Sequence, residues 1–201
     1  MGERYGQWLV PIPPSVEPIR SARGTLLIAS RSQIRALGRY EDYERALSPT
    51  VRQELDGMIA TSWAPVALVH EHLGAIDTLG LTDDIVLDGS MNVANKLHGV
   101  FLSTLVKTVR GSRVGPLAGA PLLPKIWGRV FEGGALGAAQ LGPKDARLAV
   151  RGNPLLRHRY HRVAIRTHFK MGVQLFARVA HVREESCDAE RGSLDLLASW
   201  V

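Results

Sequence analysis

Apolar residues recur at helical spacing through the first two thirds of the chain. One series follows Ser48-Pro49, a capping residue with a proline at the first helical position, which is a typical helix start. A longer series runs from Asp83 to Arg110, with acids in its first turn and bases in its last turn, as the helix dipole favours. Its broad apolar stripe predicts a helix at the centre of the core. The apolar positions of that stripe are Ile85, Val86, Val93, Leu97, Val100, Phe101 and Leu105.

Two shorter apolar segments flank these series. Residues 24–29 form an apolar run with a composition suited to a β-strand, and we expect a short strand there. Trp127 and Phe131 stand four residues apart on a predicted helix that ends before Gly133-Gly134. Because that spacing places both rings on one helix face, we expect them to lie in the core.

The last third of the chain has a different pattern. Residues 136–141 and 147–151 flank Gly142-Pro143-Lys144-Asp145, which is a turn by composition, and so predict a hairpin. Asn153-Pro154 then predicts the start of a long helix. Two further segments alternate apolar and polar positions like strands: 179–184 and 194–200. The order is therefore strand, strand, helix, strand, strand.

These patterns predict an α+β fold, because helix and strand signals segregate along the chain instead of alternating. Residues 1–22 hold four of the eleven prolines and predict an extended arm. We expect residues 23–201 to form one α+β domain. Its mainly helical part, at 30–132, is expected to pack on a small antiparallel sheet within 133–201.

Composition narrows the class of protein. A hydrophobic fraction of 45% and a charged fraction of 22% exclude a chain that is disordered throughout. No apolar run reaches the roughly 18 residues that cross a bilayer, and no signal peptide is recognisable, so we expect a cytoplasmic protein without a membrane span. The single cysteine, Cys187, excludes an intrachain disulfide, and its acidic neighbours are expected to raise the pKa of the thiol.

The net charge of +6 is concentrated in one segment. Residues 144–170 hold eight basic residues and one acid. Arg159, Arg162 and Arg166 share a helix face and are the candidate residues for binding an anion, since arginine suits bidentate contacts with phosphate or carboxylate. A solvated helix face is the simpler interpretation. A third is that these arginines pair, within the fold or across a dimer, with acids of the last hairpin: Glu184, Glu185, Asp188 and Glu190.

Histidines are the only other candidates for site chemistry. In His70-Glu71-His72, residues two apart on a helix point in different directions and cannot share a metal ion. His158, His161 and His168 lie near one helix face, but a tetrahedral site needs a further ligand, such as His181, and the surrounding positive charge opposes a cation. No phosphate-binding loop or Gly-x-Ser-x-Gly elbow is present. We therefore expect no metal site, and we favour a non-catalytic protein over an enzyme.

The layout of the second half resembles that of a known family. The segments that carry the resemblance are Leu123–Gly134 (LPKIWGRVFEGG), Gly142–Arg147 (GPKDAR), Gly152–Leu155 (GNPL) and Ala198–Trp200 (ASW). They resemble the large family of uncharacterised myxobacterial proteins of similar length. More remotely, residues 24–201 resemble the vinyl-four-reductase ligand domain and the haem–nitric-oxide-binding fold.

This resemblance implies helices on one side of a small antiparallel sheet. The remote relatives bind small or lipid-like molecules between helices and sheet, often as dimers, so the resemblance implies a ligand pocket and a homodimer. The haem-binding relatives combine a proximal histidine with a Tyr-x-Ser-x-Arg motif. That motif is absent from this chain, and we expect no haem and no other cofactor.

Two functional hypotheses follow. The first is a non-catalytic sensory or ligand-binding domain, with a pocket between the 83–110 helix, the aromatic pair and the sheet. Its candidate pocket residues are Val93, Leu97, Phe101, Trp127 and Phe131. The second is an electrostatic module that binds an anionic partner, either nucleic acid or an acidic protein, through the 144–170 segment. A cavity between helices and sheet favours the first hypothesis, and a fully packed interior contradicts it.

Overall fold

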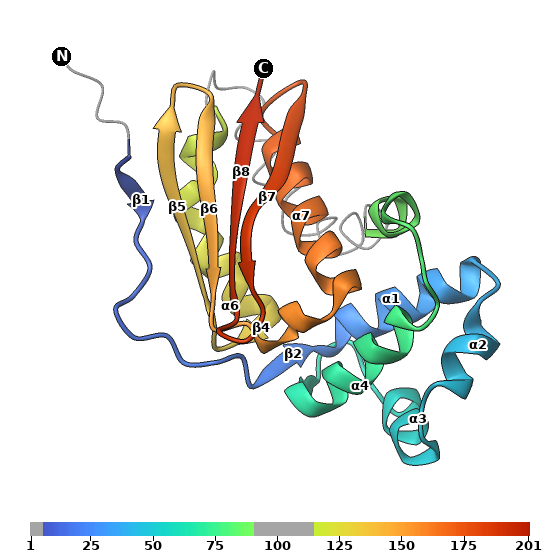
Figure 1. The fold of residues 1–201 in the computed structure, drawn as a ribbon. Coiled ribbons are helices and arrows are strands. Elements are labelled where there is room, and N and C mark those ends of the chain that lie inside the picture. The colour runs from blue at the N-terminus through green and yellow to red at the C-terminus, as the bar shows by residue number, and fades with distance from the viewer. Residues whose placement is uncertain (1–5, 91–114) are drawn as a thin grey trace.

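An antiparallel main sheet forms one layer of the molecule, and helices cover one of its faces (Figure 1). The computed structural model describes residues 6–90 and 115–201. Helices α6 and α7 lie behind the sheet in Figure 1, and α1 to α4 gather at one end of it. The α+β fold predicted from the sequence is confirmed.

The elements of the described chain follow the expected order in the last third. The helices are α1 (Gly24–Ala36), α2 (Tyr40–Arg45), α3 (Pro49–Asp56), α4 (Val66–Asp77), η1 (Pro116–Leu122), α6 (Leu123–Val130), η2 (Pro154–Arg157) and α7 (Arg159–Gln174). The strands are β1 (Trp8–Val10), β2 (Ser21–Arg23), β3 (Trp63–Pro65), β4 (Phe131–Glu132), β5 (Ala135–Gly142), β6 (Asp145–Arg151), β7 (Ala180–Asp188) and β8 (Ser193–Trp200).

The main sheet has five strands in the order β1-β5-β6-β8-β7, all antiparallel to their neighbours. Strands β5 and β6, helix α7, and strands β7 and β8 confirm the predicted order of the last third. A smaller sheet, β3-β2-β4, joins three short strands from the rest of the chain. It connects the group of helices α1 to α4 to the end of α6.

The strand predicted at residues 24–29 is wrong, because this run is the first half of helix α1. Buried positions of α1 include Leu27, Arg31 and Ile34, which recur every three to four residues and so define one helix face. A short apolar run has the same composition in a buried helix and in a strand, and only its continuation into residues 30–36 distinguishes the two.

Residues 6–23, the described part of the proline-rich segment with the end of β2, pair with the rest of the molecule at two strands. Strand β1 pairs with β5 at the edge of the main sheet, and β2 pairs with β3 and β4. Between these strands the chain runs closely over Gly133, which has a φ of 92°. A Cβ on Gly133 would lie 2.2 Å from the carbonyl oxygen of Pro18, so only glycine fits this crossing.

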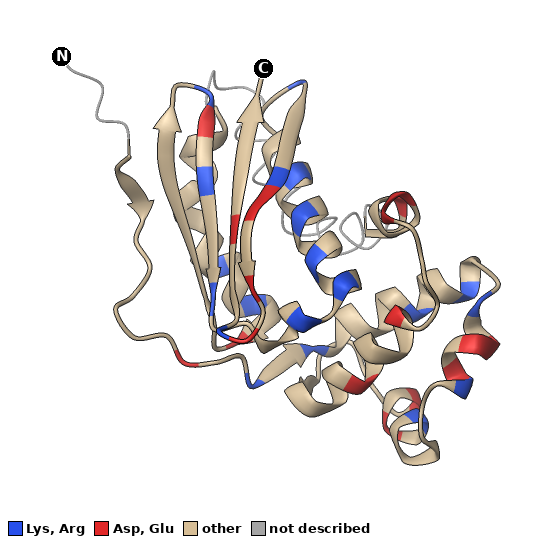
Figure 2. Cartoon of the chain, viewed as in Figure 1, with Lys and Arg blue, Asp and Glu red and all other residues tan. Residues whose placement is uncertain are grey.

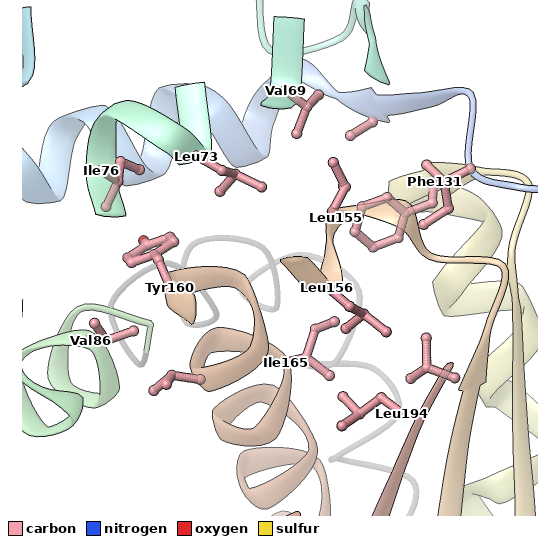
Figure 3. Close-up of a cluster of buried hydrophobic side chains, with 14 of the residues drawn as sticks. Val69, Leu73, Ile76, Val86, Phe131, Leu155, Leu156, Tyr160, Ile165 and Leu194 are labelled. Atoms are coloured by element: carbon pink, nitrogen blue, oxygen red, sulfur yellow. The ribbon is translucent and has the colours of Figure 1, made fainter. Parts of the chain in front are cut away.

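The buried cluster in Figure 3 lies where the helical group meets α7 and the sheet. Leu73 and Ile76 of α4 face Tyr160 of α7, and Leu155 of η2 lies beside Phe131. The helix predicted to begin at Asn153-Pro154 starts with the short η2 turn, after which α7 begins at Arg159.

The carboxylate of Asp77, the last residue of α4, caps the start of α7. Its Oδ1 accepts a hydrogen bond from the backbone N–H of Tyr160 at 2.9 Å, and its Oδ2 accepts one from that of Arg159 at 3.0 Å. His158 Nδ1 lies 3.4 Å from the same Oδ2. A helix otherwise leaves its first N–H groups without partners, so Asp77 supplies from another helix the cap that α7 lacks.

The helix predicted from Asp83 to Arg110 is described only at residues 83–90, which are helical. Its other positions, including the candidate pocket residues Val93, Leu97 and Phe101, lie outside the described residues. Within 6–90 and 115–201, no helix combines the length and hydropathy needed to cross a membrane.

Replacing Asp77 by Ala is expected to lower the free energy of unfolding by about 2 kcal/mol, because the first N–H groups of α7 lose their acceptor. Urea denaturation measures this change. Glu71→Ala is the matched control, because Glu71 is an exposed acid on the same helix. Equal effects of the two substitutions would show that the cap does not contribute.

The contribution of Asp77 should also depend on pH. Burial raises the pKa of its carboxyl group, but hydrogen bonds from His158 and from the Tyr160 backbone outweigh burial and hold the pKa below the ordinary 3.8. Such a group stabilises the fold fully above its unfolded pKa and loses that effect as pH falls through the folded value. The stability difference between wild type and Asp77→Ala should therefore shrink below about pH 4. A difference that stays constant in acid would contradict this account.

Candidate functional site

The described residues line a partly open pocket between α6, α7 and the face of the main sheet, which we call the interior pocket. Its volume is about 670 Å³. Strands β5, β6 and β8 supply the sheet side, and α1 and α4 close one end. The pocket predicted from the sequence therefore has a counterpart between helices and sheet.

Small side chains explain why this space is not filled. The sheet presents Ala138, Ala146 and Ala198 to the interior pocket, and Ala146 and Ala198 are directly opposite each other on β6 and β8. From α7, Ala164 and Gly172 line the same space. A Cβ on Gly172 would meet no described atom within 4 Å. Alanine and glycine thus stand where a packed core would place larger residues.

Of the five predicted pocket residues, Trp127 and Phe131 lie on this wall. Their ring centroids are 4.5 Å apart, and Trp127 is 8% exposed, so the predicted core position is confirmed. The indole Nε1 of Trp127 donates a hydrogen bond to the carbonyl of Gly133 at 2.9 Å, which fixes the ring. The prediction that Phe131 lies on the same helix as Trp127 is wrong. Helix α6 ends at Val130, and Phe131 begins strand β4.

His72 lies at one end of the interior pocket with both ring nitrogens engaged. Its Nε2 lies 2.7 Å from Oγ of Ser30, and its Nδ1 lies 2.8 Å from the hydroxyl of Tyr43. Burial, followed by the charge of Arg31, lowers the pKa of His72 to about 3, so the ring is neutral. His72 is therefore a structural part of the core.

Two further histidines line the interior pocket from α7. Nε2 of His161 lies 3.1 Å from Nδ2 of Asn153, and burial lowers the pKa of His161 to about 3. Nδ1 of His168 lies 2.6 Å from the carbonyl oxygen of Ala164, one turn earlier in the helix. Because a carbonyl only accepts, Nδ1 of His168 carries the proton and Nε2 is left as an acceptor.

Two residues that line the interior pocket each have a buried polar atom with no hydrogen-bond partner among the described residues: Nε2 of His168 and Oγ of Ser90. Neither atom has appreciable accessible surface, so neither faces the open space of the pocket. Ser90 is 1% exposed and belongs to the helical residues 83–90. Burial lowers the pKa of His168, so its ring is neutral at pH 7. Neither residue was among the five pocket residues predicted from the sequence. The seven-residue spacing of His161 and His168 placed them on one helix face, but it did not show which atoms would be left without partners.

The histidines of α7 do not converge on one point. Nε2 of His158 lies 2.9 Å from Nδ1 of His70. His161 and His168, in contrast, line the interior pocket. His70 and His72 diverge, as their spacing predicted. Among residues 6–90 and 115–201, no group of three or more histidine, cysteine or acidic side chains is placed to hold a metal ion.

The basic segment is largely engaged within the chain. Arg159 and Arg166 both pair with Asp83, Arg166 at 2.9 Å, and Arg162 donates to the carbonyl of Leu156 at 2.7 Å. Figure 2 shows basic residues repeated along α7 and acids on the neighbouring 83–90 helix. Within the described chain these three arginines form no ion pair with the acids of the last hairpin, so that pairing within the fold is wrong, and pairing across a dimer stays a prediction. Glu185 of that hairpin pairs with Arg147 instead, at 2.9 Å.

Solved structures with a similar fold are H-NOX domains. The Fe(II) unliganded H-NOX protein from K. algicida has a TM-score of 0.62 and 10% identity, covering 89% of this chain and 96% of that one. A T. tengcongensis H-NOX mutant has a TM-score of 0.62 and 10% identity, and the match covers 89% of this chain and 97% of that one. An oxygen-binding H-NOX domain related to soluble guanylate cyclases has a TM-score of 0.59 and 11% identity, with 89% of this chain and 94% of that one covered.

These likenesses show the fold, and they confirm the expected remote resemblance to the haem–nitric-oxide-binding fold. No family model matches the chain, and no curated protein matches it. The nearer resemblance to the myxobacterial proteins stays a prediction.

Replacing Trp127 by Ala is expected to lower the free energy of unfolding by about 3–5 kcal/mol, since a buried ring and its hydrogen bond to Gly133 are lost. Thermal or urea denaturation measures the loss. Trp8→Ala is the control, because Trp8 is 40% exposed on the edge strand β1. A melting temperature unchanged by Trp127→Ala would overturn the core assignment.

Replacing Asp83 by Asn should destabilise the protein by about 1 kcal/mol, because both arginines that share this half-exposed carboxylate lose their partner. Asp84→Asn is the matched control at a neighbouring acid. The effect of Asp83→Asn should shrink in high salt. If Asp84→Asn destabilises equally, the ion pairs contribute nothing specific.

Proposed function

We propose that this chain is a non-catalytic ligand-binding domain that takes an apolar small molecule into the interior pocket. The observation that carries the proposal is the pocket itself. Its volume of about 670 Å³ is within the range of ligand sites, roughly 300–1,000 Å³. Apolar side chains dominate its wall, so burial of apolar ligand surface would supply most of the binding free energy.

The fold supports the proposal, because an oxygen-binding H-NOX domain shares it. A sensory role fits the same arrangement. The pocket touches α1 and α4 at one end and the sheet with α7 at the other, so a ligand contacts both parts of the molecule. A ligand that favours one arrangement of these parts would shift the equilibrium between them.

The chemistry of the wall favours binding over catalysis. Among the described wall residues, the nitrogens of His72 are held by Ser30 and Tyr43, and His161 contacts Asn153. Cys187 lies on β7, outside the wall, and burial together with Glu184 raises the pKa of its thiol. Ser30 and His72 are a hydroxyl and a base at hydrogen-bond distance, but the Ser30 hydroxyl also lies 2.9 Å and 3.0 Å from the carbonyl oxygens of Leu26 and Leu27, which compete with His72 for its proton.

Haem requires separate consideration, because solved neighbours concern haem. It needs an axial ligand for iron and partners for two carboxylates. Nε2 of His168 has no partner among the described residues, but it has almost no accessible surface and so does not face the open space of the pocket. Arg23 on the wall already donates to the backbone carbonyls of Thr61 and Arg129 and stacks on Trp63. The described wall thus does not fit haem, and we assign no cofactor.

The alternative function, binding of an anionic partner through residues 144–170, has less support. Two of the three arginines proposed to bind the partner already form ion pairs with Asp83. The third, Arg162, donates to the backbone carbonyl of Leu156. These contacts give the arginines a structural role in positioning α7.

Replacing Gly172 by Leu should abolish binding of a neutral apolar dye such as Nile red, because the new side chain fills the interior pocket. Stability should be unchanged or higher, since leucine favours helix over glycine by up to about 1 kcal/mol. Fluorescence titration of the dye and urea denaturation measure the two effects.

Gly128→Leu is the matched control. Gly128 is also a helical glycine whose Cβ, if it had one, would meet no described atom within 4 Å, but it lies on α6 away from the pocket wall. Dye binding should survive this substitution. Absence of dye binding by the wild type, or equal binding by the Gly172→Leu protein, would contradict the proposed function.

A further inference from the structure

The charged side chains on the described wall of the interior pocket are all positive. They are Arg23 and Arg129, and the described part of the wall holds no acidic residue. Burial lowers the pKa of the wall histidines His72, His161 and His168, so their rings are neutral at pH 7. An apolar space whose described wall carries only positive charge favours a ligand with a negative charge.

Arg23 is held by groups that do not neutralise its charge. Its Nε donates to the carbonyl oxygen of Arg129 at 3.3 Å, and its Nη1 donates to that of Thr61 at 2.8 Å. Its Cζ lies 3.8 Å from the centre of the Trp63 ring. These partners fix the guanidinium group but carry no negative charge. Because an arginine has five N–H donors, the two hydrogen bonds leave N–H groups for one anionic head group, whereas haem has two carboxylates to place.

An opening of the interior pocket lies beside Arg23. Among the described wall residues, those exposed to solvent are Ala60, Thr61 and Arg129. Arg23 is half-buried and contacts the backbone of the last two. The sheet side of the wall is buried and apolar, as at Ala146. A ligand that enters by this opening therefore meets positive charge at its outer end and apolar surface at its inner end.

We propose that the interior pocket binds a long-chain carboxylate, a fatty acid, and that Arg23 pairs with its head group at this opening. The inference rests on the proposed function and names its ligand class. The hydrocarbon chain lies along the apolar wall, where its burial supplies most of the binding free energy. Arginine suits the head group because its planar pairs of N–H donors match the two oxygens of a carboxylate.

The half-buried position of Arg23 suits this role. An ion pair deep in the apolar interior would lose its hydration on both sides, whereas a carboxylate at the opening stays partly hydrated while it contacts Arg23. Arg129 lies at the same opening, so a cationic head group would meet like charge there. A neutral head group would gain only an ordinary hydrogen bond, which is weaker than one between two charged groups.

The test compares ligands with similar linear chains and different head groups: decanoate, decanol and decyltrimethylammonium. Their displacement of Nile red from the full chain is followed by fluorescence at pH 7, below the concentrations at which they form micelles. Decanoate should bind wild type about tenfold more tightly than decanol, because only decanoate forms a charge-assisted hydrogen bond with Arg23. Decyltrimethylammonium should bind most weakly.

Arg23→Met removes the charge and keeps a long side chain. Its affinity for decanoate should fall to that for decanol, while decanol and Nile red bind as in wild type. Arg23→Lys should keep part of the preference, since it retains the charge but not the planar donor pair. Arg20→Met is the matched control, because Arg20 is an exposed arginine just before β2 and outside the pocket wall. It should leave the preference unchanged.

Wild type alone also tests the charge, should Arg23→Met fold poorly. The preference for decanoate over decanol should shrink in high salt, because Arg23 lies at an opening to solvent. A preference that does not change with salt would contradict an ion pair there.

The outcomes separate this inference from the proposed function. If Nile red does not bind, or none of the three ligands displaces it, the pocket is not a ligand site and both proposals fail. If decanol and decanoate bind equally well, or Arg23→Met keeps the full preference for decanoate, the pocket function stands and the role of Arg23 is overturned. Tightest binding of decyltrimethylammonium would overturn it as well.

Discussion

The capping of α7 by Asp77 connects the two parts of this molecule. The carboxylate ends α4, which packs among the N-terminal helices, and it accepts the first free N–H groups of the helix that covers the sheet. Leu73 and Ile76 of the same helix face Tyr160, the residue whose backbone N–H donates to Asp77 (Figure 3). Because one side chain fixes where α7 begins, it also fixes which residues of α7 turn inward along its whole length.

Helix α7 has two faces with different roles. Its arginines at 159 and 166 converge on Asp83 and hold the 83–90 helix against it. That contact brings Ser90, the last described residue of the 83–90 helix, to the wall that His168 and Gly172 also line. The basic residues of α7 therefore have a structural role: two of them form ion pairs with the 83–90 helix, which supplies part of the pocket wall.

Much of the fold could be predicted because its signals are local. The Gly142-Pro143 turn and the alternation of apolar and polar residues determine the hairpins of the last third. The strand predicted at residues 24–29 was wrong because a short apolar run of this composition occurs both in buried helices and in strands. The pocket wall was predicted through its aromatic residues, Trp127 and Phe131. His168 and Ser90 could not be predicted, since whether a polar atom lacks a partner depends on contacts between segments distant in sequence.

The interior pocket has a cost in packing. Small residues such as Ala146 and Gly172 forgo the contacts that larger side chains would provide on its wall. Unfilled space in a core lowers stability in proportion to its volume. Because the described wall is largely apolar, a ligand with a matching apolar surface would restore these contacts, and burial of that surface would supply the binding free energy.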